Sequence, residues 1–159
     1  MARVILLTQG MQTVVDDEDY EWLSQYKWCA EEHKNNVWYA VHTFYGDGYE
    51  VKVLMHRLIM HEPTSGVDHQ DLNGLNNQRS NLRLATQPQN MHNTSAPRNN
   101  TSGYKGVSFH KASGKWRADI CVEGKRIALG LFPSPEEAAD AYDRVAVANF
   151  GEFARVNGN

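Results

Sequence analysis

The chain has little cysteine and no long hydrophobic run, and both features narrow its class. Its 159 residues include only two cysteines, Cys29 and Cys121, and no CxxC pair. This argues against a disulfide scaffold and a cysteine-ligated zinc site, and it favours a reducing cytosol. No apolar stretch approaches the roughly 20 residues of a membrane-spanning helix, and the apolar run at residues 4–7 is too short for a signal-peptide core. We therefore expect a cytoplasmic protein without membrane contact.

The chain also lacks the excess of positive charge that is common in nucleic-acid binders. Its formal net charge is −3, but the charge is unevenly distributed. Residues 1–66 are acidic overall, whereas residues 103–132 contain six Lys or Arg and two acidic residues. Because salt screens charges beyond roughly 8–10 Å, the local surface governs attraction to phosphates. The net charge therefore does not exclude DNA as a ligand.

The N-terminal part, residues 1–54, has the pattern of a β-rich support region. Apolar and β-branched runs predict strands at residues 4–7, 12–15, 36–44 and 49–55. The last two resemble a hairpin whose turn is Gly46, Asp47 and Gly48, and the acidic stretch from Asp16 predicts the start of a helix. Large aromatic side chains usually fill small cores. We expect this for Trp22, Trp28, Trp38 and Tyr39.

The densest polar chemistry lies in residues 67–92, which are rich in Asp, His and Asn. Asp68 next to His69 can supply a hard oxygen ligand and a base of near-neutral pKa. Because neighbouring strand residues point to opposite faces, the two side chains can cooperate only where their strand ends. The alternative is that these residues merely form a polar loop.

A helix is predicted after this cluster. Thr86 and Gln89 form a capping box, so the helix should begin near Gln87 and carry Asn90 in its first turns. A succession of strand, turn, strand and helix would bring Asp68, His69 and Asn90 together.

Several residue types recur at set spacings between residues 53 and 93. The segments are Met55-His-Arg-Leu58, Val67-Asp-His69, Asn76-Asn77, Asn81-Leu-Arg83, Thr86 and Asn90. Their order resembles the HNH endonuclease motif, in the subgroup found in phage and intron homing endonucleases. The resemblance implies a ββα-metal core around one divalent cation, within an α+β fold.

The same resemblance implies roles for individual residues. His69 matches the general base that takes a proton from the attacking water, and Asn81 matches the Asn that braces the loop and orients the base. Asp68 and Asn90 match two metal ligands. Two hard oxygen ligands favour Mg²⁺ or Mn²⁺ over Zn²⁺. No other small-molecule cofactor is expected.

Four more polar residues lie near the motif. Arg57 and Arg83 are candidates for phosphate contacts, with ordinary ion pairs as the alternative. His56 matches a recurring family position, although a lone His between apolar residues is usually structural. His92 stands two positions after Asn90 and so does not share its helix face. We leave His92 out of the site.

The C-terminal part combines three short strands with one helix. Strands are predicted at residues 104–109, 116–122 and 125–131, and Ser134 and Glu137 form a capping box with Pro at the first helical position. Apolar residues at helical spacing predict the helix face that covers the sheet. They are Ala138, Ala141, Tyr142, Val145 and Ala148.

This part resembles the AP2/ERF-type DNA-binding domain. The matching segments are Tyr104-Lys-Gly-Val107, Gly114-Lys-Trp116, Ala118-Asp-Ile120, Gly130-Leu-Phe132, Glu136-Glu-Ala-Ala139, Ala141-Tyr-Asp143 and Phe150-Gly151. The resemblance implies that the sheet enters the major groove and that the helix braces it from behind. Candidate DNA-binding residues are Lys105, His110, Lys115, Arg117, Asp119, Lys125 and Arg126. Ser108, Cys121 and Ala128 replace Arg, Arg and Trp of plant members, so we expect a different target sequence.

These patterns divide the chain into a support region (1–54), an HNH nuclease core (55–93), a linker (94–103) and an AP2/ERF-like domain (104–157). We expect a metal-dependent endonuclease that nicks or cuts double-stranded DNA, as a monomer or a homodimer. The expected setting is a homing enzyme in a bacterial or phage-infected cell. Two alternatives stay open, a non-catalytic DNA-binding regulator and a nuclease that acts on RNA or structured DNA.

Overall fold

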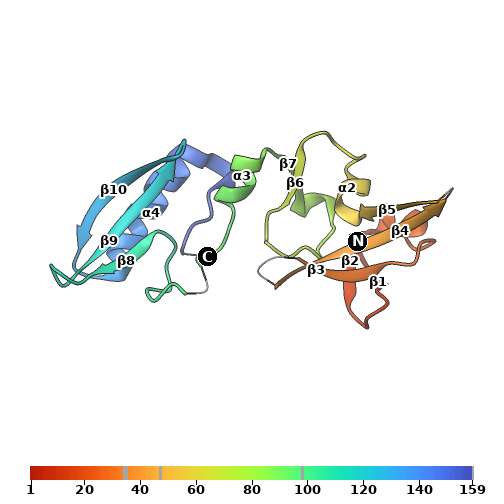
Figure 1. Cartoon of the computed structure of the whole chain (residues 1–159), viewed down its shortest axis with the longest axis horizontal. Coiled ribbons are helices and arrows are strands. Elements are labelled where there is room, and N and C mark those ends of the chain that lie inside the picture. The colour runs from red at the N-terminus through yellow and green to blue at the C-terminus, as the bar shows by residue number, and fades with distance from the viewer. Residues whose placement is uncertain (34–35, 47, 98, 159) are drawn as a thin grey trace. The chain divides into compact units, whose positions relative to one another are not determined.

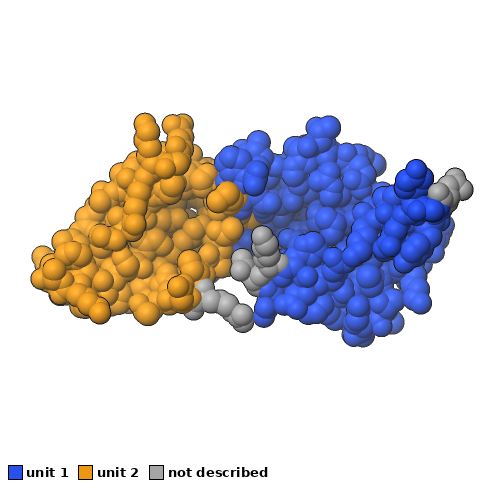
Figure 2. All heavy atoms as spheres, in the orientation of Figure 1, with its two compact units in different colours: residues 1–90 blue, residues 91–159 orange. Residues whose placement is uncertain are grey.

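The computed structural model describes residues 1–33, 36–46, 48–97 and 99–158. It divides into two compact units, Met1–Asn90 and Met91–Asn159, which Figure 2 shows in different colours. The described strands form small antiparallel sheets, and short helices accompany them, so the fold is of the α+β class. Among the described helices, none is long and apolar enough to cross a membrane.

Unit 1 contains three small sheets (Figure 1). The first pairs β1 (Ala2–Leu6) with β2 (Gln12–Asp16), and α1 (Asp17–Leu23) follows directly. The second has the order β3 (Cys29–His33), β4 (Val37–Gly46), β5 (Tyr49–Leu54), and α2 (Met55–Ile59) follows it. The third pairs β6 (Gly66–His69) with β7 (Leu82–Ala85), with the 3-10 helix η2 (Arg79–Asn81) between them and α3 (Gln87–His92) after them.

The strands and the helix predicted for the N-terminal part are present, and β3 is an addition. The sequence of β3, Cys-Ala-Glu-Glu-His, is short and polar, and it has little of the β-branched composition that marks a strand. Its pairing with β4 holds it in the sheet. Asp47 of the predicted turn and Arg98 of the predicted linker lie outside the described residues.

The core of unit 1 joins all three sheets. Its buried members are Ile5, Leu7, Val15, Leu23, Trp28, Ala30, Ala40, Met55, Ile59, Val67 and Leu82. Trp28 is 1% exposed, and its indole N–H donates to the Leu23 carbonyl at 2.8 Å. Trp22 and Trp38 are partly buried against this core, as expected. Because β1 and β2 share the core with β6 and β7, the N-terminal part is structurally continuous with the strand that carries Asp68 and His69.

Unit 2 is a three-stranded sheet with one helix against it (Figure 1). The strand order is β10 (Lys125–Phe132), β9 (Lys115–Val122), β8 (Val107–His110); α4 (Pro135–Phe150) and a 3-10 turn, η3 (Gly151–Phe153), complete it. Ser134 Oγ accepts a hydrogen bond from the Glu137 N–H at 3.2 Å, which confirms the predicted helix start.

One prediction for α4 is wrong. Its buried residues are Ala138, Ala139, Ala141, Tyr142 and Ala146, whereas Ala148 is exposed. At about 100° per residue, position 148 is turned roughly 200° away from Ala146 and therefore faces away from the sheet. The predicted stripe followed i+3 steps beyond Val145, while the buried face follows i+4 steps.

Candidate active site and nucleic-acid interface

Asp68 and His69 are the last two residues of β6, and both side chains are buried, at 4% and 5% exposure. The strand ends at His69. Asp68 and His69 can therefore cooperate, because we expected this only where their strand ends. The chain then turns, and the Leu72 N–H donates to the His69 carbonyl at 3.0 Å.

Arg83 is the β7 residue that pairs with Asp68 in the antiparallel register. Its Nε and Nη2 both donate to Asp68 Oδ2, at 2.9 and 2.7 Å. The Arg83 side chain is only 10% exposed. In this structure the guanidinium predicted to hold a phosphate thus orients and partly neutralises the Asp68 carboxylate.

The His69 ring lies among polar and aromatic groups from several elements. Its Nε2 is 3.2 Å from Asn77 Oδ1, and its ring centroid is 4.8 Å from that of His56 and 5.7 Å from that of Tyr39. Burial lowers the pKa of His69 below 6.5, and the Asn77 hydrogen bond and nearby carboxylates oppose this. The imidazole is therefore neutral at neutral pH, the state in which a ring nitrogen can accept a proton. Tyr39, expected in the core, lies beside the His69 ring.

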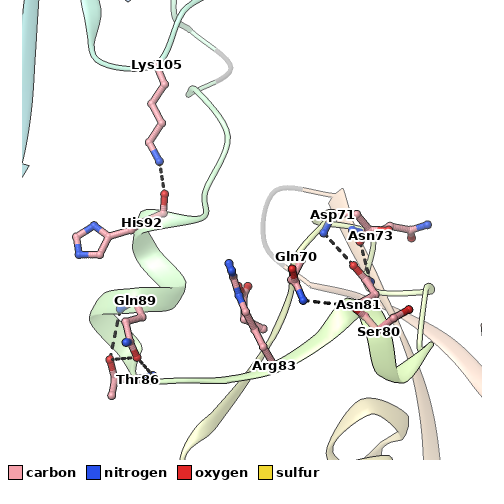
Figure 3. A network of polar contacts seen from close by, with 11 residues as sticks. Gln70, Asp71, Asn73, Ser80, Asn81, Arg83, Thr86, Gln89, His92 and Lys105 are labelled. Atoms are coloured by element: carbon pink, nitrogen blue, oxygen red, sulfur yellow. Dashed lines mark hydrogen bonds and ion pairs between the residues drawn. The ribbon is translucent and has the colours of Figure 1, made fainter. Parts of the chain in front are cut away.

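Asn81 braces the loop between β6 and β7 (Figure 3). Its Oδ1 accepts from the Asp71 N–H at 3.0 Å, and its Nδ2 donates to Asp71 Oδ1 at 2.9 Å and to the Asn76 carbonyl at 2.8 Å. The amide that contacts the His69 ring belongs to Asn77. Asn81 thus contacts the loop, and Asn77 contacts the His69 ring.

The capping box at the start of α3 is present (Figure 3). Gln89 Oε1 accepts from the Thr86 N–H at 2.8 Å, and Thr86 Oγ1 accepts from the Gln89 N–H at 3.4 Å. The helix begins at Gln87, as predicted. Asn90 is exposed on it, and its N–H donates to the Thr86 carbonyl. The His92 ring stacks on Phe150 within unit 2, with centroids 3.7 Å apart.

The metal donors implied by the sequence are the Asp68 carboxylate and the Asn90 amide. Within the described part of the chain, no group of three or more His, Cys, Asp or Glu could hold a metal ion. One carboxylate and one amide oxygen are hard ligands without thiolate or imidazole. This donor chemistry fits Mg²⁺ or Mn²⁺ and not a structural zinc site.

Two neighbours of His69, His56 and Asn77, could not be assigned to the site from the sequence. His56 is 6% exposed, and its Nδ1 has no hydrogen-bond partner among the described residues. Burial, followed by the neighbouring His69 and Arg57, lowers the pKa of His56 to about 3. Asn77 is fully buried, and its Nδ2 donates to Thr13 Oγ1 at 2.7 Å. Because 64 residues separate Thr13 from Asn77, no local pattern marks Thr13.

Arg57 holds the loop that leads into β6. Its Nη2 donates to the Pro63 carbonyl at 2.7 Å, and its Nε lies 3.3 Å from Glu62 Oε2. This hydrogen bond and the ion pair join Arg57 on α2 to the loop that follows the helix.

In unit 2, the strand register separates the predicted DNA-binding residues by face. Ala118 and Ile120 of β9 are buried against α4, so the alternate positions of β9 and their cross-strand partners face away from the helix. The residues on this outer face are His110, Lys115, Arg117, Asp119 and Arg126. Lys125 pairs with Val122 and therefore lies on the face of the sheet that is turned toward α4.

Lys105 precedes β8 and does not belong to the sheet. Its Nζ donates to the His92 carbonyl at 2.6 Å (Figure 3). Burial, with Arg155 nearby, lowers the pKa of Lys105 to about 8.

Asp119 organises the charge on the outer face. Its Oδ2 lies 2.7 Å from Arg117 Nε and 2.8 Å from Arg126 Nη2. Asp119 is 11% exposed, whereas the two arginine side chains are 38% and 66% exposed. The carboxylate thus orients two guanidinium groups, and the three side chains together stay positive.

Comparisons with known proteins agree with the order of the two units along the chain. The AP2 domain family matches residues 102–152. The chain is 35% identical over 128 residues to a mimivirus (Acanthamoeba polyphaga mimivirus) protein named as an uncharacterised HNH endonuclease, L560, covering 76% of this chain and 66% of L560. It is 45% identical over 89 residues to Protein 3.8 of Escherichia phage T7, covering 56% of this chain and 73% of that protein. It is also 41% identical over 63 residues to the APETALA2-like protein 2 of rice (Oryza sativa subsp. japonica), covering 40% of this chain and 14% of that protein.

Proposed function

The chain belongs to the family of HNH endonucleases with a C-terminal AP2 domain, and we propose that it is a metal-dependent endonuclease that hydrolyses phosphodiester bonds in double-stranded DNA. The observation that carries the proposal is the buried Asp68–His69 pair at the end of β6. A carboxylate beside a neutral imidazole supports metal-assisted hydrolysis, because it offers a hard oxygen donor and a proton acceptor.

His69 is the general base of the proposed reaction. A neutral imidazole within hydrogen-bond reach can take a proton from the attacking water, which typically contributes 10²–10⁴-fold to the rate. The burial that lowers the pKa of His69 keeps the ring unprotonated at neutral pH. Asn81 holds the loop after His69 in one conformation through Asp71.

Asp68 and Asn90 would hold one divalent cation, Mg²⁺ or Mn²⁺. When bound, such a cation stabilises negative charge on the scissile phosphate and on the leaving oxygen. Arg83 fixes the Asp68 carboxylate through two hydrogen bonds to Oδ2.

The outer face of the unit 2 sheet is the proposed duplex-binding surface. Arg117 and Arg126, oriented by Asp119, offer planar donors that suit phosphates and guanine edges. The nuclease would thus act at or near sites selected by this sheet, as expected of a homing endonuclease, by nicking as a monomer or cutting both strands as a homodimer.

Cleavage of supercoiled plasmid tests the proposal. The purified chain should give relaxed or linear DNA with Mg²⁺ and none with EDTA. His69→Ala should lose at least about 100-fold in rate. His61→Asn is the matched control, because His61 is exposed and has a positive φ that Asn accommodates.

Two results would contradict the proposal. One is cleavage at close to the wild-type rate in His69→Ala, or cleavage in EDTA. The other is a wild-type chain that binds duplex DNA but cuts none of a pooled genomic library with Mg²⁺ or Mn²⁺, which would favour a non-catalytic regulator.

A further inference from the structure

A buried chain of hydrogen bonds connects His69 to the β1–β2 hairpin. Thr13 Oγ1 donates to the Leu75 carbonyl at 2.8 Å, Asn77 Nδ2 donates to Thr13 Oγ1 at 2.7 Å, and Asn77 Oδ1 lies 3.2 Å from His69 Nε2. Thr13 and Asn77 are fully buried, and His69 is 5% exposed. Water is therefore a poor competitor for these bonds.

The Leu75 carbonyl, at one end of this series of hydrogen bonds, fixes which group donates in each of them. A backbone carbonyl can only accept, so the single hydroxyl proton of Thr13 points to Leu75. The Met55 sulfur, 3.9 Å from the same hydroxyl, is a far weaker acceptor. The Thr13 oxygen then accepts, and the atom of Asn77 that faces it must be the NH₂ group. Asn77 consequently turns its carbonyl oxygen to His69.

The carbonyl oxygen of Asn77 determines which ring nitrogen of His69 carries the proton. Because this oxygen can only accept, the facing Nε2 must be the protonated nitrogen of the neutral ring. The lone pair is then on Nδ1. A flipped Asn77 amide would reverse this and direct the lone pair of His69 to a buried NH₂ group.

Backbone hydrogen bonds hold Leu75 and Asn77 against β2. The Val14 N–H donates to the Leu75 carbonyl at 2.9 Å, and the Asn77 N–H donates to the Val14 carbonyl at 2.8 Å. These two bonds fix β2 against the loop that carries Asn77. Further along the loop, the Arg79 guanidinium donates to both carboxylate oxygens of buried Asp19, at 2.8 and 2.7 Å.

We infer that Thr13 and Asn77 are positioning residues that hold His69 as its Nε2–H tautomer, with Nδ1 as the proton-accepting atom. The inference rests on the proposed function, in which His69 is the general base. It gives the N-terminal hairpin a part in the chemistry. Outer partners of metal ligands are typically worth 10–100-fold in activity, and we expect a loss of that size here.

Four variants separate positioning from folding. Thr13→Val keeps the shape and removes the hydroxyl, and Thr13→Ser restores it. Asn77→Ala removes the acceptor, whereas Asn77→Asp keeps an oxygen facing His69. Val15→Ala is the matched control, because Val15 is also fully buried on β2 but takes no part in the hydrogen-bond chain.

The first readout is the tautomer of His69, measured on the full chain by long-range ¹H–¹⁵N NMR at pH 8, with His69→Ala to assign the signal. We expect the Nε2–H pattern in the wild type, Thr13→Ser, Asn77→Asp and Val15→Ala, and a mixed or Nδ1–H pattern in Thr13→Val and Asn77→Ala. An Nδ1–H wild type, or a tautomer unchanged in Asn77→Ala, overturns the inference. This readout needs neither metal nor DNA and stands even if no cleavage is found.

The second readout is plasmid cleavage with Mg²⁺. We expect kcat to fall about 10–100-fold in Thr13→Val and Asn77→Ala with KM unchanged, and to recover in Thr13→Ser. A fall in Val15→Ala as large as that in Thr13→Val would mean that lost stability explains both, and would overturn the positioning role. Absence of cleavage in the wild type together with the Nε2–H tautomer would count against the proposed function and not against the geometry.

Discussion

Acid should destabilise unit 1 through His56. The ring lies on α2 at 6% exposure, and its Nδ1 has no partner among the described residues. The titratable groups that act on it are His69 on β6, Arg57 on α2 and His33 on β3, and each favours the neutral ring. Tyr39 on β4 covers it with centroids 5.2 Å apart. Burial is the largest cause of the lowered pKa, which is about 3.

The sign and size of the effect follow from this pKa. In the unfolded chain a histidine titrates near 6.5, so between pH 6.5 and 3 the unfolded state binds more protons than the folded state. The free energy of unfolding then decreases as the pH falls through this window. At about 1.36 kcal/mol per pH unit, His56 alone should cost about 2 kcal/mol between pH 8 and pH 5.

Urea unfolding of the full chain at pH 8 and pH 5 measures this loss. Trp22, Trp28 and Trp38 all lie in unit 1, so tryptophan fluorescence reports mainly on it. His56→Phe keeps a planar ring and removes the titrating group, and we expect its loss to be smaller than that of the wild type by about 2 kcal/mol. His61→Asn, at an exposed histidine, should keep the full pH dependence. Equal pH dependence in His56→Phe and the wild type would refute the reasoning.

Two further predictions concern unit 2. A Cβ at Gly106 would lie 2.1 Å from Tyr142 Cδ2, whereas one at Gly103, which has a similar positive φ, meets no described heavy atom within 4 Å. Thermal unfolding should therefore show that Gly106→Ala costs at least about 2 kcal/mol more than Gly103→Ala, and equal losses would contradict the packing. Arg126→Gln should weaken duplex binding and reduce the slope of log K against log salt by about 0.9. Lys125→Gln, on the helix side of the sheet, should have a smaller effect. A salt titration in which Lys125→Gln has the larger effect would refute the assignment of the outer face.

The parts of the fold that the sequence could predict rest on local signals. The two capping boxes, at Thr86 and Ser134, fixed the starts of α3 and α4 to the residue. Both depend on contacts between residues three positions apart, which a sequence shows directly. The strand end at His69 was readable for the same reason, because turn-forming residues follow it.

The contacts that complete the candidate site are not local. Asn77 meets Thr13 across 64 residues, and Arg79 meets Asp19 across 60. An Asn in a polar loop and a Thr in a strand are ordinary residues, and only tertiary packing joins them. The placement of the His56 ring 4.8 Å from that of His69 likewise depends on tertiary packing. A lone His between apolar residues therefore gave no reason to prefer a role in the site.

The environment of His69 explains why the N-terminal part belongs to the proposed nuclease. Its neighbours are Asn77 from the loop, His56 from α2 and Tyr39 from β4, and Asn77 is in turn fixed by Thr13 from β2. In the proposed function the HNH motif supplies the reacting groups, while burial favours the neutral ring and Thr13 of β2 fixes the Asn77 amide that faces it. The proposed chemistry therefore depends on residues 1–54, and a fragment limited to residues 55–93 would lose the cover that Tyr39 gives His69 and the hydrogen bond between Thr13 and Asn77.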